Sequence, residues 1–241
     1  MTPRINELWV YLSASPLLGL TITLIAYQGA FWIYRRSGNH PMANPVLIAV
    51  SVLVAFLMLT ETTYETYFAG AQFVHFLLGP ATVALAIPLY TQFKRVKAML
   101  LPVLAGLFIG SLTAALSAVA IGRLFGASLP SQLSLAPKSV TTPIAMGVAE
   151  RIGGIPSLTA VLVIITGVIG AVGARYVFDA MGLRDPAIRG FAIGIASHGI
   201  GTARAFQVNE QSGAFAALAM GLNGALTALL LPLIVRWTGL S

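Results

Sequence analysis

The 241-residue chain is 57% hydrophobic and only 9% charged, with a mean hydropathy of +0.88. Soluble domains carry about 25% charged residues, so this composition excludes a soluble globular protein and indicates an integral membrane protein. The formal net charge of +7 would suggest a nucleic-acid partner in a soluble protein. Here the basic residues lie mainly in short loops between apolar segments, where they report membrane orientation, and no nucleic-acid partner is expected. The absence of cysteine excludes disulfides and thiol catalysis.

Apolar segments in chain order predict an all-α protein with about seven transmembrane helices. The first segment ends at Arg35-Arg36, and the second precedes an acidic loop with Glu61 and Glu65. At 1.5 Å per residue, uninterrupted runs of this kind reach across a hydrocarbon core of roughly 30 Å. The predicted spans are Trp9–Tyr34, Pro45–Thr60, Ala71–Tyr90, Ala98–Gly122, Leu158–Phe178, Ala187–Val208 and Ala214–Trp237.

Three regions are interrupted by prolines, glycines or polar residues. Gly79-Pro80 interrupts the third span, Ser197–Thr202 interrupts the sixth, and Ala127–Pro156 is too broken and polar for an ordinary span. If Ala127–Pro156 is re-entrant, the basic loops all face the cytoplasm, as the positive-inside rule requires. If it crosses fully, Arg184 and Arg189 move outside. We favour the re-entrant topology, whose cytoplasmic residues are Arg35, Arg36, Lys94, Arg95, Lys97, Arg175, Arg184, Arg189 and Arg236.

Short matches recur in the same order in both halves of the chain. Their equivalent loops fall on opposite faces, which predicts two inverted repeats, residues 1–125 and 126–241, in a single membrane domain. Inverted repeats with discontinuous helices are typical of secondary transporters, whose substrates bind near the bilayer midplane. The matching pairs are Pro45–Val50 with Pro156–Val161, Gly79–Thr82 with Gly199–Thr202, and Gly110–Leu116 with Gly224–Leu230.

The segment Pro137–Met146 places a cation, three hydroxyls and two prolines among apolar segments. Because Pro143 cannot donate a backbone N–H and disfavours helix at the preceding residue, a helix is expected to begin here. A half-helix at membrane depth would offer free N–H groups to a small anion, whereas the alternative is an ordinary helix start in an exposed loop. The candidate N-cap and substrate-binding side chains are Lys138, Ser139, Thr141 and Thr142.

The break at His198–Thr202 offers freed backbone groups and an imidazole, and Arg204 follows shortly afterwards. An intramembrane guanidinium indicates a site and can grip a carboxylate bidentately, so Arg204 is predicted to hold the substrate charge. Alternatively, Arg204 pairs with Glu150 or Glu210, or extends to the interface. The other predicted substrate-binding residues are His198, Gly199, Gly201 and Thr202, with Thr82 in the first-half break.

Three residues are candidates for proton or ion coupling: Glu150, His198 and Glu210. Each glutamate lies eight residues after a threonine of a broken motif, but Glu150 can equally pair with Arg151 or face solvent, and Glu210 can lie in an exposed loop. Asn223, in the middle of a span, is expected to hydrogen-bond a neighbouring helix. No P-loop, histidine pair at ligand spacing or serine elbow occurs in the sequence, so we expect no enzyme activity and no metal or other cofactor.

These motifs resemble the LrgB/CidB family of bacterial membrane proteins, to which the plastid glycolate/glycerate translocator is related. The resemblance runs from about Asn44 to the C-terminus and implies a multi-pass protein of the bacterial cytoplasmic (inner) membrane. The residues that carry it are Gly79–Tyr90, Pro137–Ala145, Gly153–Val161 and Ser197–Ala205.

The resemblance implies two functions of different classes. One is transport of small monocarboxylates such as glycolate, glycerate, pyruvate or acetate, coupled to protons. The other is antiholin-like modulation of murein hydrolase activity and autolysis, with a small holin-like (LrgA/CidA-type) membrane protein as partner. We favour the carrier, because each charge at mid-bilayer costs roughly 3 kcal/mol and must be compensated by pairing or by a ligand. Glycine-rich helices also permit a homodimer.

Overall fold

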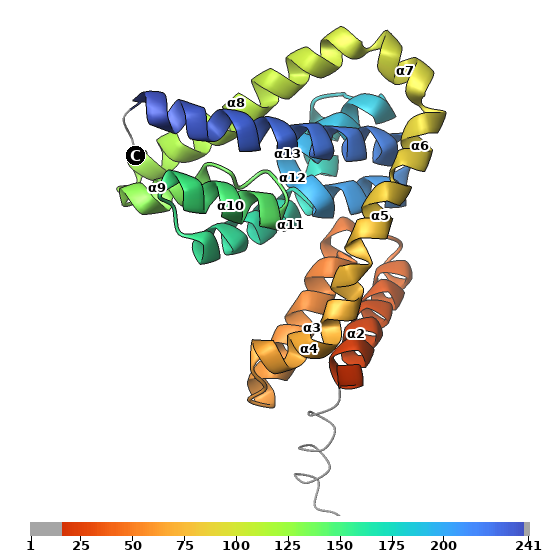
Figure 1. The fold of residues 1–241 in the computed structure, drawn as a ribbon. Coiled ribbons are helices and arrows are strands. Elements are labelled where there is room, and N and C mark those ends of the chain that lie inside the picture. Colours follow the sequence, from red (N-terminus) through yellow and green to blue (C-terminus); the bar gives the residue numbers. More distant parts are fainter. Residues whose placement is uncertain (1–15, 239–241) are drawn as a thin grey trace, which may run out of the picture. The chain divides into compact units, whose positions relative to one another are not determined.

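The computed structural model describes residues 16–238, which form helices and connecting turns without a β-strand (Figure 1). The chain divides into two units, residues 1–84 and 85–241. The predicted repeat boundary at residues 125 and 126 falls inside the second unit, between α8 and α9. The first unit contains α2 (Pro16–Arg36), η1 (Pro41–Ala43), α3 (Pro45–Leu59), α4 (Tyr64–Phe76) and α5 (Leu78–Ala84).

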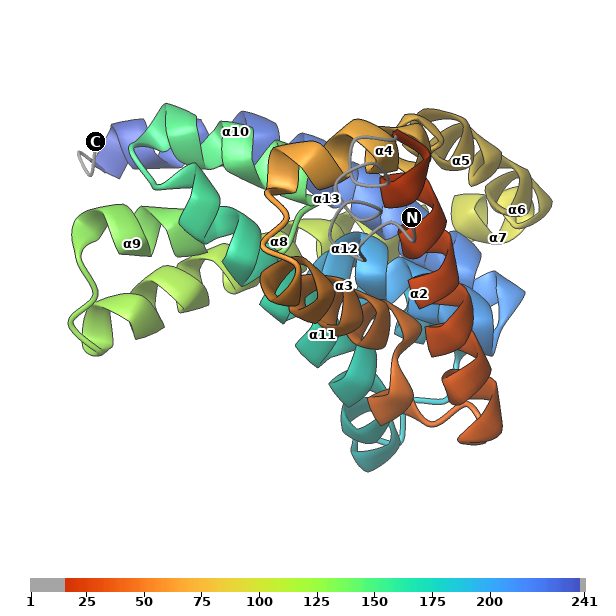
Figure 2. The same cartoon turned by 90° about the horizontal axis from the view of Figure 1, so that it is seen from below.

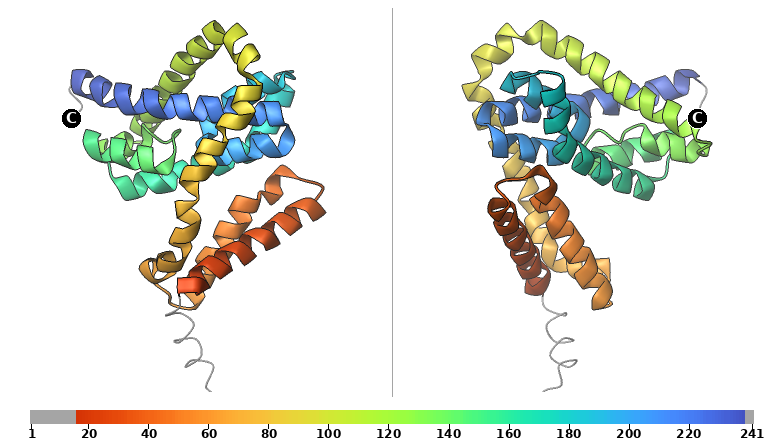
Figure 3. Two further views of the ribbon diagram at one scale, coloured as in Figure 1. Left: turned by 45° about the vertical axis from the view of Figure 1, so that its right-hand side comes forward. Right: turned by 180° about the vertical axis from the view of Figure 1, so that it is seen from behind.

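In the first unit, α2 packs against both α3 and α4 (Figure 3). Gly19 of α2 lies directly against the backbone carbonyl of Tyr67 in α4, where a side chain would not fit. The Thr23 hydroxyl lies 2.8 Å from the Tyr67 hydroxyl, which adds a polar contact between the same two helices. At the start of α3, the Asn44 side chain accepts hydrogen bonds from the N–H groups of Val46 and Leu47, so it serves as the N-cap.

The third predicted span is divided near Gly79-Pro80, since α4 ends at Phe76 and α5 begins at Leu78, but the intervening Leu77 keeps right-handed helical angles, so the interruption is slight. Pro80 is the third residue of α5, and Pro88 is likewise the third residue of α6 (Ala86–Thr91). Proline is tolerated in the first turn of a helix, where its missing N–H has no intrahelical partner. Each proline therefore begins a new helical segment without reversing the chain.

The second unit begins with α6 and continues through seven further helices. Its long helices α8, α11 and α13 are apolar enough to cross a membrane by length and composition. Together with Leu17–Arg36 and Tyr64–Thr91, they give five such segments in residues 16–238, which indicates a multi-pass membrane protein. The seven helices are α7 (Phe93–Ala98), α8 (Leu100–Leu124), α9 (Leu129–Leu135), α10 (Thr142–Ile152), α11 (Pro156–Ala180), α12 (Pro186–Val208) and α13 (Glu210–Thr238).

Helix α12 folds back on itself at His198, whose angles (φ 41°, ψ −132°) are not helical. Ile193 and Ala205 share one buried cluster, although a straight helix would hold them about 18 Å apart. Gly201 also packs against Ser197 and the backbone of Ile193. We call residues 186–208 hairpin 2, with its tip at His198.

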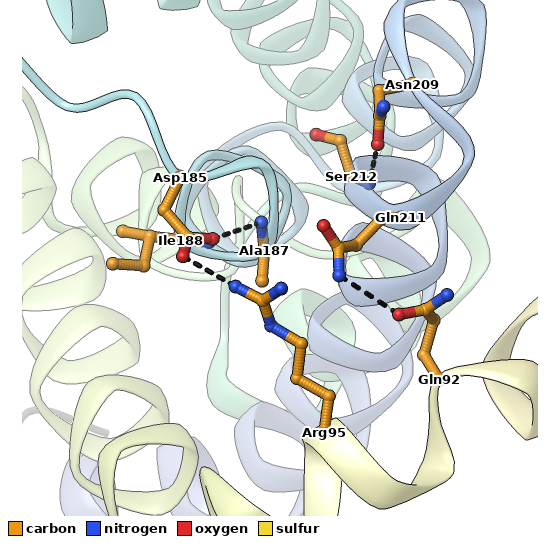
Figure 4. Close-up of polar contacts among 8 residues, drawn as sticks. All are labelled: Gln92, Arg95, Asp185, Ala187, Ile188, Asn209, Gln211 and Ser212. Atoms are coloured by element: carbon orange, nitrogen blue, oxygen red, sulfur yellow. Dashed lines mark hydrogen bonds and ion pairs between the residues drawn. The ribbon is translucent and has the colours of Figure 1, made fainter.

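Both ends of hairpin 2 lie beside a single turn of the chain between α6 and α7 (Figure 4). The Arg95 guanidinium forms an ion pair of 2.6 Å with Asp185, and the Gln211 amide donates to the Gln92 side chain at 3.1 Å. The predicted transmembrane span Ala187–Val208 is therefore wrong. The segment has the apolar length of a span, but each of its arms is only about half as long.

Residues 129–152, named hairpin 1, also fold back. The Ser134 hydroxyl accepts a 2.7 Å hydrogen bond from the backbone N–H of Ile155, just beyond α10. Leu133 and Ile152 share a buried cluster, so the start and the end of hairpin 1 are neighbours. The chain returns to its starting end within residues 127–156, as a re-entrant segment must. The connection 136–141 forms the tip of hairpin 1.

Helix α13 contacts the two hairpins one after the other (Figures 1 and 2). Gly190 and Gly194 of hairpin 2 lie so close to the first third of α13 that a side chain at either position would meet the α13 backbone. Near the other end of α13, Leu231 and Val235 share a buried cluster with hairpin 1. The two hairpins therefore approach from opposite ends of α13, and their tips meet near its middle.

The hairpin form of α12 predicts a specific set of cross-links. The sequence has no cysteine, so paired cysteines can be introduced without background. We expect Gln92→Cys to cross-link with Gln211→Cys, and Arg95→Cys with Asp185→Cys, in non-reducing gels. A straight α12 of 23 residues would separate its ends by about 35 Å and allow at most one pair. As a control, Gln92→Cys with Gly221→Cys should remain unlinked, because the exposed Gly221 lies 10 residues, or about 15 Å, beyond Gln211 along α13.

Candidate functional site

The two hairpin tips are joined by the side chain of Asn223, in the middle of α13. Its Nδ2 donates hydrogen bonds of 3.2 Å to the backbone carbonyls of Ser139 in hairpin 1 and Ile195 in hairpin 2. Asn223 is only 1% exposed. We call the region around this amide the tip junction. Sequence reasoning singled out Asn223 as a helix-contact residue, but the two carbonyls that it joins lie 84 and 28 residues away in the chain.

Helix α11 contacts both tips at Val163. The Val163 side chain packs against Val140 of hairpin 1 in a buried cluster. Its backbone carbonyl lies 3.0 Å from His198 Nε2 in hairpin 2. One turn further along α11, a side chain at Gly167 would meet the His198 ring, so glycine lets the imidazole approach the helix. Sequence reasoning missed Val163 and Gly167, because neither residue type indicates a polar site.

A helix begins at each tip with its N-terminus toward the junction. Thr141 occupies the N-cap position of α10, but no side chain hydrogen-bonds to the first N–H groups of this helix. The second arm of hairpin 2 begins after His198. In its first turn, the Thr202 hydroxyl donates a hydrogen bond of 2.8 Å to the His198 carbonyl. Because the first N–H groups of a helix lack intrahelical partners and carry partial positive charge, the junction favours an anion. The predicted residues Lys138, Ser139 and Thr141 thus lie in the tip of hairpin 1, and Thr142 begins α10 directly after it. His198 and Gly199 lie in the tip of hairpin 2, and Gly201 and Thr202 in the first turn of its second arm.

The side chains at the tip junction include a cation and hydrogen-bonding groups that the protein leaves unused. The Lys138 ammonium donates a 3.2 Å hydrogen bond to the Ser139 hydroxyl. Among the described residues, only Ser197 Oγ and Asn223 Oδ1 are buried side-chain polar atoms without a hydrogen-bond partner in the protein. Buried polar atoms normally have a hydrogen-bond partner, so two such atoms without one near the tips favour a ligand or water at this position.

Three predicted site residues lie away from the tip junction. Glu150 is exposed in the last turn of α10, and Glu210 is the exposed first residue of α13. Both carboxylates are therefore at hairpin bases. Thr82 lies in the first unit, exposed on α5, where its hydroxyl donates to the Leu78 carbonyl. Each glutamate lies eight residues after a threonine near a tip because the second arms of the two hairpins have similar lengths. That distance along the arm places both glutamates outside the tip junction.

Arg204 lies on the second arm of hairpin 2 and is 8% exposed. It lines a pocket of about 190 Å³ together with Arg175 and Arg189. The residues that surround this pocket come from α11, both arms of hairpin 2 and the start of α13, and none belongs to the tips 136–141 or 197–199. The structure thus separates Arg204 from the tip residues with which sequence reasoning grouped it.

Comparison with known proteins gives the family. The family model described as the LrgB-like family matches residues 23–237. The chain belongs to the LrgB-like family. It is 35% identical to YwbG and 34% identical to YxaC of Bacillus subtilis (strain 168), covering 98% and 94% of these relatives and 92% and 90% of itself.

The LrgB-like chain is also 30% identical to the antiholin-like protein LrgB of Bacillus cereus (strain B4264), over 93% of the chain and 98% of that relative. No solved structure matches it. The tip junction and the arginine pocket of this LrgB-like protein are therefore described from its own geometry.

Replacing Asn223 tests whether its amide holds the tips. Asn223→Leu keeps a similar volume but leaves the Ser139 and Ile195 carbonyls without their donor. Because buried groups left unsatisfied cost about 1–3 kcal/mol each, we expect a melting temperature several degrees lower in detergent. Gly221→Ala is the control, since Gly221 is exposed on the adjacent turn with open space around it. Equal melting temperatures for Asn223→Leu and wild type would show that the amide does not hold the tips.

Proposed function

We propose that this LrgB-like protein is a secondary transporter of small monocarboxylates in the bacterial cytoplasmic (inner) membrane. The observation that carries the proposal is the Asn223 amide, which joins two oppositely directed hairpin tips halfway along α13. Non-helical backbone is tolerated at membrane depth only where it is buried in protein or lines a cavity. Broken helices that meet near the midplane are typical of carriers.

The chemistry of the tip junction suits a small acid. Each of the two helix N-termini carries roughly half a positive charge, and Lys138 adds a full one. A carboxylate can accept hydrogen bonds from N–H groups and the ammonium together. The two tips bind the same Asn223 amide, which favours substrates of a few carbon atoms, such as glycolate, glycerate, pyruvate or acetate.

His198 is the residue that we assign to proton coupling. Its Nε2 faces the Val163 carbonyl, an acceptor, which requires a proton on Nε2 and leaves Nδ1 to take up or release another. Glu150 and Glu210, by contrast, are exposed at hairpin bases. The second proton would therefore arrive and leave at the same tip that offers N–H groups to the substrate.

A second candidate function is supported by the names of relatives. The similar proteins of Bacillus cereus are called antiholin-like. This favours a modulator of murein hydrolase activity and autolysis, acting with a small holin-like membrane partner. Such a protein works through its surfaces and does not need a polar junction at membrane depth, so the geometry favours the carrier while the names favour the modulator.

Flux measurements distinguish the two functions. We expect the purified chain alone in proteoliposomes to give saturable uptake of labelled glycolate, glycerate or pyruvate, and we expect an imposed pH gradient to change the rate. Empty liposomes are the control. No saturable flux with any of these acids, at any pH gradient, together with altered autolysis in cells that express the chain, would favour the modulator.

Lys138 is expected to contribute to substrate affinity. Lys138→Gln removes the charge at the tip, so we predict a rise in KM of about tenfold, the loss of roughly one charge-assisted contact. Lys97→Gln removes the same charge from an exposed position on α7 and should leave KM unchanged. A KM for Lys138→Gln equal to that of Lys97→Gln would remove Lys138 from the substrate site.

A further inference from the structure

An apolar groove lies between α8 and the first arm of hairpin 2. Every residue that lines it is apolar or glycine. Val103 of α8 shares a buried cluster with Ala187 at the start of the arm, and Leu107 shares another with Ile195 near the tip. Helix α8 and the arm therefore run in the same direction, and the groove follows them from the base of hairpin 2 toward its tip.

Contacts between α8 and the arm close one side of this groove. A methyl group added at Gly106 would lie 3.3 Å from the Phe191 ring. One added at Gly110 would lie 3.3 Å from the Ile195 side chain. Small residues spaced four apart on a membrane helix commonly let another helix approach. On α8 that face already receives side chains of hairpin 2, so it is not free to dock a helix of a second copy.

The groove has the length of one leaflet of a bilayer and is too narrow for a helix. From Ala187 to Ala196 the arm rises about 14 Å, close to half of a hydrocarbon core of roughly 30 Å. The volume of about 600 Å³ over that length leaves a mean cross-section of about 40 Å², whereas a helix about 10 Å across needs about 80 Å². Extended hydrocarbon chains are thinner than a helix and fit this space.

The base end of the groove carries positive charge. Arg95 and Asp185 form an ion pair there, so these two charges cancel (Figure 4). Lys94 and Arg184 flank the pair in sequence and are exposed. Within the described part of the chain, neither of them forms an ion pair. The exposed carboxylate of Glu210 at the same base offsets only one of these two cations.

We propose that this groove binds one anionic phospholipid from the leaflet around the base of hairpin 2. An acyl chain lies between α8 and the first arm, and the phosphate group meets Lys94 and Arg184. Basic side chains next to a membrane segment attract anionic headgroups, while the apolar lining replaces the neighbouring lipid chains. The site is separate from the tip junction, and the inference does not depend on transport of carboxylates.

Native mass spectrometry of the full chain in a neutral detergent tests the headgroup contacts. The probes are phosphatidylglycerol and phosphatidylcholine with identical acyl chains. We expect one phosphatidylglycerol to bind saturably, with a Kd about tenfold lower than that of phosphatidylcholine. The double variant Lys94→Gln/Arg184→Gln should raise the Kd of phosphatidylglycerol about tenfold and leave that of phosphatidylcholine unchanged. Arg123→Gln is the control, because it removes an exposed arginine from the last turn of α8, outside the groove.

A bulky side chain in the groove tests where the acyl chain lies. Ala196 is exposed and lines the tip end of the groove, so Ala196→Trp fills that end. We expect the Kd of both lipids to rise about tenfold, which corresponds to the burial of about two methylene groups. Ala105→Trp places the same side chain at an exposed position of α8 outside the groove and should bind both lipids as wild type does.

The outcomes that overturn the proposal are specific. They are the absence of saturable phosphatidylglycerol binding, equal Kd values for the two lipids, wild-type binding by Ala196→Trp, and an effect of Arg123→Gln as large as that of the double variant. If Ala196→Trp does not fold, Ala192→Trp at the middle of the groove decides in its place. A dimer in detergent that Ala196→Trp disrupts, with no bound lipid, would assign the groove to a second copy and overturn the lipid site.

Discussion

A single amide in the middle of α13 links the two hairpins of the second unit. Asn223 donates from one nitrogen to two carbonyls that belong to different hairpins, so neither hairpin tip is held independently of the other. In a low-dielectric interior such hydrogen bonds are stronger, and the cost of losing them is higher, than in water. The small residues of α12 and α13 let the backbones of these two helices approach each other, so that the Ile195 carbonyl comes within reach of Asn223. The position of the tips follows from these two features together.

The reversal at His198 is a strained feature that its surroundings hold in place. A positive φ in a residue other than glycine costs of order 1–3 kcal/mol and persists where packing determines it. Here the ring lies between Gly167 and the Val163 carbonyl, and the Thr202 hydroxyl binds the His198 carbonyl. The contacts with Gly167 and Val163 use the side chain itself, which explains why a histidine, and not a glycine, occupies the turn. A ligand at the tip junction would act directly on the strained residue.

Sequence reasoning predicted hairpin 1 and misread hairpin 2 for the same physical reason. Around Pro143, prolines, hydroxyls and a cation signal a helix start within a short distance along the chain, and local signals are what a single sequence carries. The arms of hairpin 2 are apolar and together have the length of a span, so hydropathy cannot distinguish a reversal from a crossing. The reversal is determined by the packing of Gly190 and Gly194 on α13, and this packing joins residues about 22 positions apart in the sequence. Sequence reasoning singled out Arg204 for its charge, but the reversal of hairpin 2 determines which residues, Arg175 and Arg189 among them, line the same pocket.

The reversal also changes which face of the membrane each end of α13 reaches. With α12 as a hairpin, Asp185 and Gln211 lie on the same side as Gln92 and Arg95, and α13 must cross from there to the other face. Under the proposed function, the positive-inside rule would place on the cytoplasmic side Arg184 and Arg189 at the base of hairpin 2, together with the neighbouring α7 residues Lys94, Arg95 and Lys97. Arg236, near the far end of α13, then lies on the opposite face from Arg95, not beside it as the seven-span topology required. The base of hairpin 1 packs against that far end, so in the same topology hairpin 1 would enter from outside. In the proposed carrier, the two half-helix N-termini would then reach the tip junction from opposite faces, as alternating access requires.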